Sequence, residues 1–453
     1  MPRKPALFAW LLVLALPAAL LLPGRAPYRV GAAAGPSLPD SDCPRYRWVD
    51  PTPDPANARR CGNCHAEIHA EWQAGGHARS LTSTFFRTLY DGSDASGQPG
   101  RGWSLLADHP DGAAVCASCH APTAFDEPAG DFDLRSVAET RGALSGVHCD
   151  FCHKVVGPGP GEYGLTHGRY QLELLRPDPN GEPRQVIFGP LRDPTRGENV
   201  FSPFYRDSRY CAACHEGVVF GVHVYSTYLE WLESPARRHG KECQTCHMAP
   251  TGRMTNVAPG HGGKERDPLT LGNHHFFDGS QADMLRRCLS LGVTAARGAG
   301  QVTAEVRVVA TGVGHRVPTG FPDRQVLLAV EGIDPQGRAV LPTDGPTLPR
   351  VVGGALAGQA GRLYAKVLRD FDGNSPVPFW RARPEFTDTR LRPEVADESR
   401  YVFPPEVRQV RARLLYRRFW HEVAEVKGWR GNTVTIRELV RAVGLEPRRG
   451  VRR

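Results

Sequence analysis

The sequence predicts a mixed fold in which a loop-rich, mainly helical first part is followed by a β-sandwich-like domain and a C-terminal helix. Three observations support this prediction. The 453 residues include 49 Gly and 40 Pro, a content that favours irregular structure. All 12 cysteines lie before residue 290, and alternating apolar patterns typical of strands follow it. The length is sufficient for two or three domains.

Residues 1–35 are predicted to be a signal peptide. Arg3 and Lys4 precede the uncharged run "ALFAWLLVLALPAALLL", and the small residues "GAAAG" follow it, which is the order of a secretory signal and its cleavage region. An uncleaved anchor helix is the alternative, but Pro17 interrupts the run, which is close to the shortest that spans a bilayer. In both cases we expect the rest of the chain to be exported to the periplasm or the cell surface, where cysteines meet an oxidising environment.

One motif, Cys-x-x-Cys-His, occurs five times between residues 43 and 290. At this Cys and His content, chance gives about 0.01 copies per chain, so the repetition indicates a shared chemical role. The five copies use ten of the twelve cysteines. We number them as sites one to five: Cys61–His65, Cys116–His120, Cys149–His153, Cys211–His215 and Cys243–His247.

The spacing of the motif is that of an attachment site for c-type haem. Two thiols reach the two vinyl groups of one porphyrin, and the adjacent His lies over the iron as its proximal ligand. Structural zinc and redox dithiols are the alternatives, but neither requires a His directly after the second Cys. The sequence therefore predicts a domain, residues 43–290, that carries five covalent haem c groups. The attachment cysteines are Cys61, Cys64, Cys116, Cys119, Cys149, Cys152, Cys211, Cys214, Cys243 and Cys246, and the proximal ligands are His65, His120, His153, His215 and His247.

The chain is basic, with a net charge of +8 and the tail "EPRRGVRR". Such features often indicate nucleic-acid binding, but export argues against that partner. Each haem carries two propionates, so five haems add roughly ten negative charges that offset the basic surplus. We therefore predict no nucleic-acid partner.

The stretch "CGNCHAEIHAEWQAGGHARS", residues 61–80, suggests where distal iron ligands come from. A helix is predicted to begin near His65 and to end at Gly75 and Gly76. His69 lies four residues after His65 on the same helix face, so it cannot reach the opposite side of the same iron. His77 follows the two glycines and is predicted to bind a different iron.

Other histidines extend the set of distal candidates. Only four methionines are present, so bis-His coordination is favoured, and it gives lower potentials than His/Met coordination. One candidate directly precedes Cys149, one lies in the aromatic stretch "FGVHVYSTY", and one of the pair in "GNHHFF" is predicted to bind. The last lies in "GVGHRVPTGFPDR", where it would connect the later domain to the haems, with an exposed loop histidine as the alternative. The distal candidates are therefore His77, His148, His223, His274, His275 and His315.

A second stretch, "TYLEWLESPARRHG", repeats the Glu-Trp of "IHAEWQAGGHARS". Aligning Trp72 with Trp231 places Ala236 opposite His77. The second copy lacks the ligand and is therefore predicted to serve packing only. Both tryptophans are predicted to pack against porphyrin faces.

Two cysteines, Cys43 and Cys288, lie outside the motifs. In an oxidising compartment they either form a disulfide or stay unpaired, because sequence alone fixes no connectivity.

After residue 290 the motif disappears and strand patterns begin. The run "QVTAEVRVVA" alternates, with Val302, Ala304, Val306 and Val308 on one face, and "RQVLLAVEGID" and "VRQVRARLLY" show the same pattern. The turn sequence "DPQG" separates two such runs. Residues 291–417 are therefore predicted to form the β-sandwich-like domain. Residues 418–453 are predicted to form a C-terminal helix, within "YRRFWHEVAEVKGW", and a basic tail.

Taken together, "CHAEIHAEWQAGGHA", "GVHCDFCHKV", "CQTCHM", "NHHFF" and "GHRVPTGFPDR" resemble the multihaem cytochrome c family that includes the tetrahaem partner of hydroxylamine oxidoreductase. The resemblance covers roughly residues 55–330. It implies closely packed bis-His haems that pass electrons, with His77 as a distal ligand. It also implies redox proteins as partners, such as a membrane quinol dehydrogenase or other multihaem cytochromes, and leaves the oligomeric state open.

The same family contains enzymes, notably nitrite reductases and hydroxylamine oxidoreductase. A haem catalyst needs an open coordination position, and the ammonia-forming nitrite reductases usually replace one attachment His by Lys. All five motifs here end in His, and five sites are fewer than hydroxylamine oxidoreductase has. We therefore predict an electron-transfer protein. The alternative is a multihaem oxidoreductase acting on a small nitrogen or sulfur oxyanion at an open haem; a scaffold whose β domain docks partners is a third hypothesis.

Overall fold

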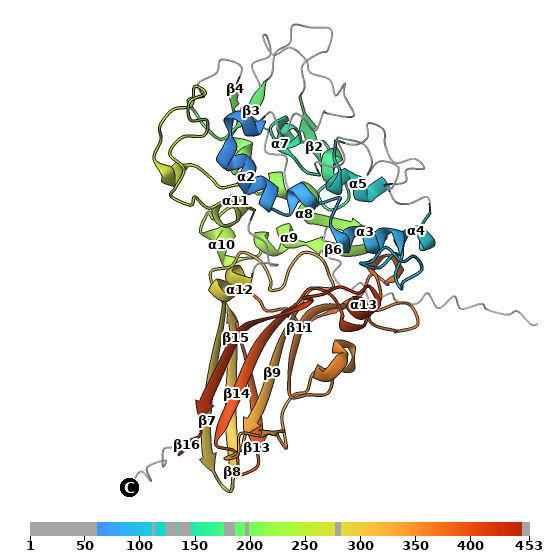
Figure 1. Cartoon of the computed structure of the whole chain (residues 1–453), viewed down its shortest axis with the longest axis vertical. Coiled ribbons are helices and arrows are strands. Elements are labelled where there is room, and N and C mark those ends of the chain that lie inside the picture. The colour runs from blue at the N-terminus through green and yellow to red at the C-terminus, as the bar shows by residue number, and fades with distance from the viewer. Residues whose placement is uncertain are drawn as a thin grey trace, which may run out of the picture. The chain divides into compact units, whose positions relative to one another are not determined.

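The computed structural model describes residues 61–110, 114–123, 134, 146–175, 186–194, 199–276 and 282–445. The predicted signal peptide and Cys43 lie outside these residues, and with Cys43 the question of whether it pairs with Cys288. Figure 1 shows helices with a few short strands from the blue to the yellow-green part of the chain, and long strands from yellow to red. We call the described residues up to 288 the first part, and residues 289–445 the β part.

The first part is built from short helices. The attachment motif of site one forms a helical turn over residues 61–64, and the other four motifs end in or fill short helices. Isolated helices below about 12–15 residues are marginal in water, so these helices depend on tertiary contacts. The α-helices are α2 (Ala66–Ala74), α3 (Thr84–Asp91), α4 (Leu105–Asp108), α5 (Ala114–His120), α7 (Cys149–Cys152), α8 (Arg209–His215), α9 (Thr227–Leu232), α10 (Pro235–Arg238), α11 (Cys243–His247) and α12 (Ala282–Cys288).

Helix α2 confirms the helix predicted after His65. It runs through good helix formers and stops at Gly75, whose backbone is extended, with φ −79° and ψ 170°. Its N–H still donates to the carbonyl of Trp72 at 2.9 Å. The chain then turns through a 3-10 helix that begins at His77, so the glycine pair redirects this histidine away from the helix.

Short two-stranded sheets and 3-10 helices complete the first part. The antiparallel pairs are β1 (Val155–Pro158) with β2 (Leu172–Leu174) and β5 (Glu216–Val219) with β6 (Val222–Ser226), and the parallel pair is β3 (Ile187–Gly189) with β4 (Asn199–Phe201). The 3-10 helices here are η1 (His77–Arg79), η3 (Gly168–Gln171), η4 (Pro203–Arg206) and η5 (Pro268–Thr270).

The β part contains two sheets that share an apolar core. Strand β8 alternates as predicted, with Val302, Ala304, Val306 and Val308 at most 1% exposed. Val306 packs in one buried cluster with side chains of β9 and β14, so the sheets face each other as in a sandwich. One sheet has the order β13-β8-β7-β16 and the other β12-β11-β9-β14-β15, with β10 on β9. The strands are β7 (Leu289–Gly298), β8 (Gln301–Ala310), β9 (Gln325–Ile333), β10 (Ala339–Val340), β11 (Gly361–Leu368), β12 (Phe386–Asp388), β13 (Ala396–Phe403), β14 (Gln409–Arg417), β15 (Thr433–Ala442) and β16 (Gly444–Leu445), and the 3-10 helices are η6 (Arg350–Val352), η7 (Gly354–Leu356) and η8 (Phe379–Arg381).

The C-terminal region differs from the prediction. The helix α13 covers only His421–Val426, because β14 continues to Arg417 and Gly428 turns the chain with a φ of +64°. The chain then returns as β15, which pairs antiparallel with β14 from Arg417↔Thr433 to Gln409↔Ala442. Residues 433–442 are therefore part of the sheet rather than of a C-terminal helix, and the predicted basic tail "EPRRGVRR" lies outside the described residues.

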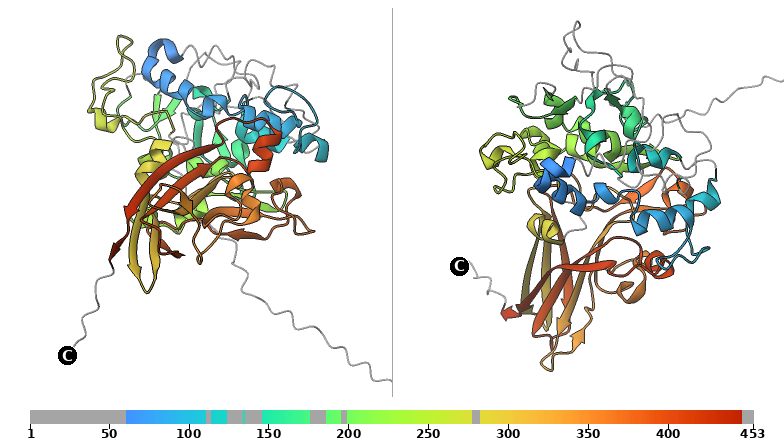
Figure 2. Two further views of the ribbon diagram at one scale, coloured as in Figure 1. Left: turned by 60° about the horizontal axis from the view of Figure 1, so that its bottom comes forward. Right: turned by 45° about the horizontal axis from the view of Figure 1, so that its top comes forward.

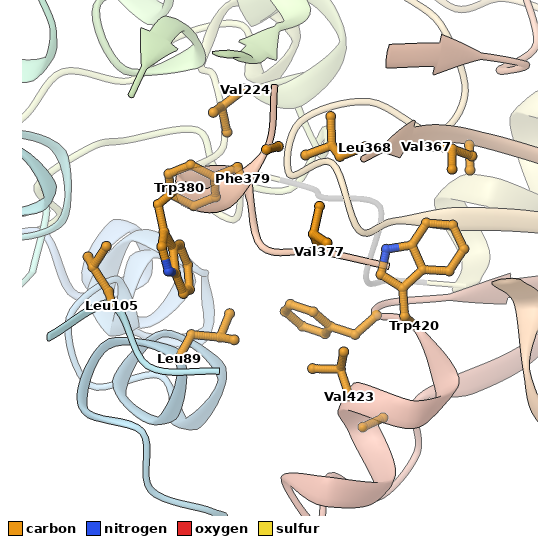
Figure 3. Close-up of a cluster of buried hydrophobic side chains, with 14 of the residues drawn as sticks. Leu89, Leu105, Val224, Val367, Leu368, Val377, Phe379, Trp380, Trp420 and Val423 are labelled. Carbon is orange, nitrogen blue, oxygen red and sulfur yellow. The ribbon is translucent and has the colours of Figure 1, made fainter. Parts of the chain in front are cut away.

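Buried contacts connect the two parts. The Lys427 ammonium, after α13, donates to the carbonyls of Thr88 (2.6 Å), Ser93 (2.9 Å) and Trp103 (2.7 Å) in the first part. Figures 1 and 2 show the red α13 beside the blue α3 and α4. Figure 3 shows Leu89 of α3 in one apolar cluster with Trp420 of the β part. In the described ranges, no helix has both the length and the apolar character needed to cross a bilayer.

Candidate haem-binding cavity

The five motifs meet in a single cavity of about 2240 Å³, which residues of the first part line together with segments of the β part such as residues 311–321. All ten attachment cysteines and all five proximal histidines line it. Pockets for one small molecule usually measure about 300–1,000 Å³, so this cavity is large enough for several bulky groups. Trp72 and Trp231 line it as well, as expected for rings that pack against porphyrins. The size and the donor set fit several covalently attached haems.

Three proximal histidines face a second imidazole across this cavity. The ring centres of His153 and His274 are 6.4 Å apart, and their planes differ by 27°. A metal–imidazole nitrogen bond is about 2 Å long, so two imidazoles on opposite sides of one iron have ring centres roughly 6 Å apart. The other two pairs have the same spacing: His77 and His215 at 6.3 Å, and His247 and His315 at 6.2 Å.

Each of the three facing histidines is brought to the cavity by a different element. His77 begins η1 after the glycine pair, and His274 lies in the loop that precedes α12. His315 lies between β8 and β9, so the β part supplies an imidazole to site five. In the pair "HH" of "GNHHFF", the structure places His274, and not His275, in the lining of the cavity.

Backbone carbonyls orient three of the proximal imidazoles. The Nδ1 atoms of His65, His120 and His153 lie 2.7 Å, 2.8 Å and 2.7 Å from carbonyl oxygens of Val257, Ser80 and Phe188. A carbonyl only accepts, so Nδ1 carries the proton and Nε2 stays available for a metal. Sequence reasoning missed these partners because a backbone acceptor has no residue signature.

Burial keeps several of these histidines neutral. Desolvation lowers the pKa of His215 to about 3, and the neighbouring His77 lowers it further in the same direction. Burial also lowers the pKa of His274 to about 3 and depresses the pKa values of His120, His153 and His315. The neutral imidazole is the form that binds a metal. In the described ranges, no group of three or more His, Cys, Asp or Glu side chains is arranged to hold a separate metal ion.

The other three distal candidates do not line the cavity. The Nε2 of His148 is 3.0 Å from the Thr123 hydroxyl in a buried contact. On β6, His223 pairs with the carboxylate of Glu216. The backbone N–H of His275 donates to Asn273 at 2.9 Å. The structure therefore brings none of these three opposite a proximal histidine.

Sites one and two differ from the other three. All 17 histidines of the chain fall in the described residues, and among these neither His65 nor His120 has a second imidazole opposite it. The ring of His120 instead stacks on Phe86, with centres 4.0 Å apart.

Contacts between residues of different attachment sites show which sites are neighbours. The hydroxyl of Tyr210, next to site four, donates to the carbonyl of Cys152 in site three at 2.7 Å. Site four therefore contacts site three. Cys214 of site four lies beside Cys119 of site two, and Cys211 of site four lies beside Cys243 of site five. The neighbouring thiol of Cys149 lowers the pKa of Cys61, that of Cys214 lowers the pKa of Cys119, and that of Cys211 lowers the pKa of Cys243, so the thiols of each pair lie close together.

Comparisons with known proteins also point to a haem-binding site. Residues 60–154 match the family model described as cytochrome c554 and c-prime. The structure is similar to that of a penta-haem cytochrome c552 from Thermochromatium tepidum, with a TM-score of 0.63 and 21% sequence identity over 85% of this chain and 98% of that chain. No curated protein matches the sequence. The family match and the shared fold confirm the resemblance to multihaem cytochromes c.

Proposed function

We propose that this chain is an electron-transfer protein that carries five covalently attached haem c groups in the periplasm or at the cell surface. The observation that carries the proposal is the single cavity lined by all ten motif cysteines and all five motif histidines. When bound, a haem iron with two imidazole ligands supplies one-electron oxidation and reduction.

The positions of the facing histidines and of the adjoining attachment sites support this function. The three imidazole pairs, at 6.2–6.4 Å, would hold the irons of sites three, four and five between two histidines, and these irons would then have no free position for a substrate. Sites one and three, three and four, two and four, and four and five adjoin each other. Site four, whose second imidazole is His77, is therefore the proposed junction of the pathway.

The proposed partners are redox proteins, with a membrane quinol dehydrogenase or other multihaem cytochromes as the expected donors or acceptors. No nucleic-acid partner is proposed.

The test is production of the full chain in an export-competent host that attaches haem c. We expect an intact mass equal to the polypeptide plus five haems, and a pyridine haemochrome spectrum of thioether-linked haem. Cys116→Ala/Cys119→Ala should remove one haem of the five. A bare polypeptide mass would overturn the proposal. If an iron of site one or two turned over nitrite or another small oxyanion, the oxidoreductase would replace the electron carrier.

A further inference from the structure

Two Glu-Trp pairs occupy equivalent places in the first part. Glu71 and Trp72 lie on α2, and Glu230 and Trp231 lie on α9. All four side chains are buried, at 6–9% exposure. Both helices lie in the region of the attachment motifs (Figure 1), and both tryptophans line the cavity.

Each tryptophan binds the backbone just before an attachment motif. The indole N–H of Trp72 donates to the carbonyl of Val147 at 2.8 Å, and that of Trp231 donates to the carbonyl of Lys241 at 2.8 Å. Val147 and Lys241 each lie two residues before the first cysteine of their motif, in sites three and five. The two indoles therefore hold two attachment motifs at the same position.

A backbone hydrogen bond is also found at the same position in both Glu-Trp segments. The N–H of Val147 donates to the carbonyl of His77 at 3.0 Å, and the N–H of Lys241 donates to the carbonyl of Ala236 at 3.0 Å. Both acceptors lie five residues after their tryptophan. The weak sequence repeat is thus a repeated structural unit that is conserved in its contacts although Ala replaces His.

Each glutamate binds the loop that carries the facing imidazole. Glu71 accepts from the backbone N–H of His274 at 2.8 Å. Glu230 accepts from the backbone N–H of Arg316, directly after His315, at 3.2 Å, and from the hydroxyl of Thr319 at 2.8 Å. His274 faces the motif histidine of site three, and His315 faces that of site five.

We infer that the two Glu-Trp pairs are positioning residues, each of which fixes both axial segments of one haem site, site three for Glu71-Trp72 and site five for Glu230-Trp231. The inference rests on the proposed haem function. In each unit the indole holds the segment of the proximal histidine and the carboxylate holds the segment of the distal one. Such partners of metal ligands set the orientation of the ligand, and a site needs its ligands placed within about 0.5 Å.

The role also explains why the second copy has Ala236. A Cβ built on Gly314 would lie 3.3 Å from the Ala236 Cβ and 3.2 Å from the Trp231 ring. The loop that brings His315 to site five therefore packs against the small side chain of Ala236. The repeat keeps its glutamate and tryptophan, and the imidazole of site five comes from the β part instead.

The test uses Glu71, which forms no ion pair among the described residues, whereas Glu230 forms a salt bridge with Arg390. In the full holoprotein, Glu71→Leu removes the acceptor and keeps an apolar side chain in the buried space, and Glu71→Ala is a second arm. We expect either change to convert about one of the five ferric irons from low spin to high spin in electron paramagnetic resonance, with five haems still attached. Glu71→Gln should restore the low-spin spectrum, because its amide oxygen still accepts. Glu67→Ala, exposed on the same helix, should leave the spectrum unchanged.

A second comparison separates this inference from the proposed function. His274→Ala should produce the same single high-spin iron, and Glu71→Leu/His274→Ala should produce no more than one. If His274→Ala creates a high-spin iron and neither Glu71→Leu nor Glu71→Ala does, the positioning role is overturned and the haem function stands. If the unsubstituted protein carries no thioether-linked haem, the proposed function fails before the positioning role is reached.

Discussion

The first part and the β part differ in what fills their centres. The long strands of the β part have eight to ten residues, and its core is made of side chains such as Val306, Val326 and Leu414, each at most 1% exposed. The first part has helices of four to nine residues around a cavity of about 2240 Å³. Because interiors of folded proteins are close-packed, a cavity of this size fits the several covalently attached groups that the five motifs predict, whereas the β part has an apolar core of its own.

This difference assigns different physical roles to the two parts. In the first part, residues such as Trp72 and Glu71 form hydrogen bonds to the backbone of segments around the cavity. In the β part, most residues are placed by strand pairing and burial. The β part nevertheless lines part of the cavity, and its loop with His315 faces the proximal histidine of site five.

Preventing haem attachment should produce the largest effect. With all ten motif cysteines changed to serine, we expect α2, α8 and α9 to lose most of their amide-exchange protection, because the filling of their core is absent. Strands β8, β9 and β14 should keep protection within about tenfold of the holoprotein, because local stability follows local packing. Hydrogen exchange read by mass spectrometry measures both. Equal loss of protection in the two parts would contradict the comparison.

Lys427 should contribute most to the contact between the parts. Its ammonium is 0% exposed and donates to the carbonyls of Thr88, Ser93 and Trp103. Lys427→Met removes three charge-assisted hydrogen bonds, so we expect a loss of about 2–3 kcal/mol of unfolding free energy, with unfolding of the two parts no longer coincident. Calorimetry of the holoprotein measures this. The exposed Lys264→Met is the matched control, and an equal effect of both changes would sink the prediction.

A buried carboxyl in the loop between β8 and β9 should give a pH-dependent effect. Asp323 is 2% exposed, and burial raises its pKa from 3.8 to about 8. The folded protein then binds a proton that the unfolded chain releases between about pH 4 and pH 8, so stability falls as pH rises through this window. Asp323→Asn should remove that slope and raise the unfolding free energy at pH 7 by about 1–3 kcal/mol.

The measurement is the midpoint of thermal unfolding at pH 5, 6, 7 and 8, before and after the Asp323→Asn change. Asp372→Asn, which alters an exposed carboxyl, is the control and should leave the slope as it is. A slope that persists in Asp323→Asn would assign the pH dependence to other groups.

The sequence predicts local features of this molecule far better than distant pairings. The five motifs, the end of α2 at Gly75 and the alternation of β8 depend on neighbouring residues, and they appear in the structure as expected. The choice of His274 over His275 depends on which imidazole enters the cavity, which spacing along the chain does not specify. The backbone carbonyls that orient His65 and His153 leave no trace in the residue types.

Two segments show what the sequence does not specify. The segment around α13 has helix-forming residues, but Gly428 and pairing with β14 end the helix and return the chain to the sheet as β15. The second Glu-Trp stretch packs as predicted, with Trp231 in a buried cluster against Tyr228 and Ala236. Its hydrogen bonds to Lys241 and Arg316 depend on residues that folding, and not sequence proximity, brings together.

The smallest expected effect concerns the orientation of the imidazole pairs. The planes of His77 and His215 differ by 58°, whereas those of the pairs His153–His274 and His247–His315 differ by 27° and 21°. Nearly parallel axial imidazoles separate the two iron d orbitals that bond with them, and strongly rotated planes leave these orbitals closer in energy. The ferric signal of site four should therefore show a larger maximum g value than those of sites three and five.

His77→Ala assigns that signal. It should abolish the signal with the largest maximum g value and add one high-spin iron, while leaving the signals of the two nearly parallel pairs in place. His315→Ala is the matched change in the β part, and it should remove one of the two signals with smaller maximum g values instead. If both substitutions removed the same signal, His77 and His315 would not serve different irons, and the β part would lose its distinct place at site five. If each removes its own signal, the β part completes one haem site of the five while the first part completes sites three and four from its own loops.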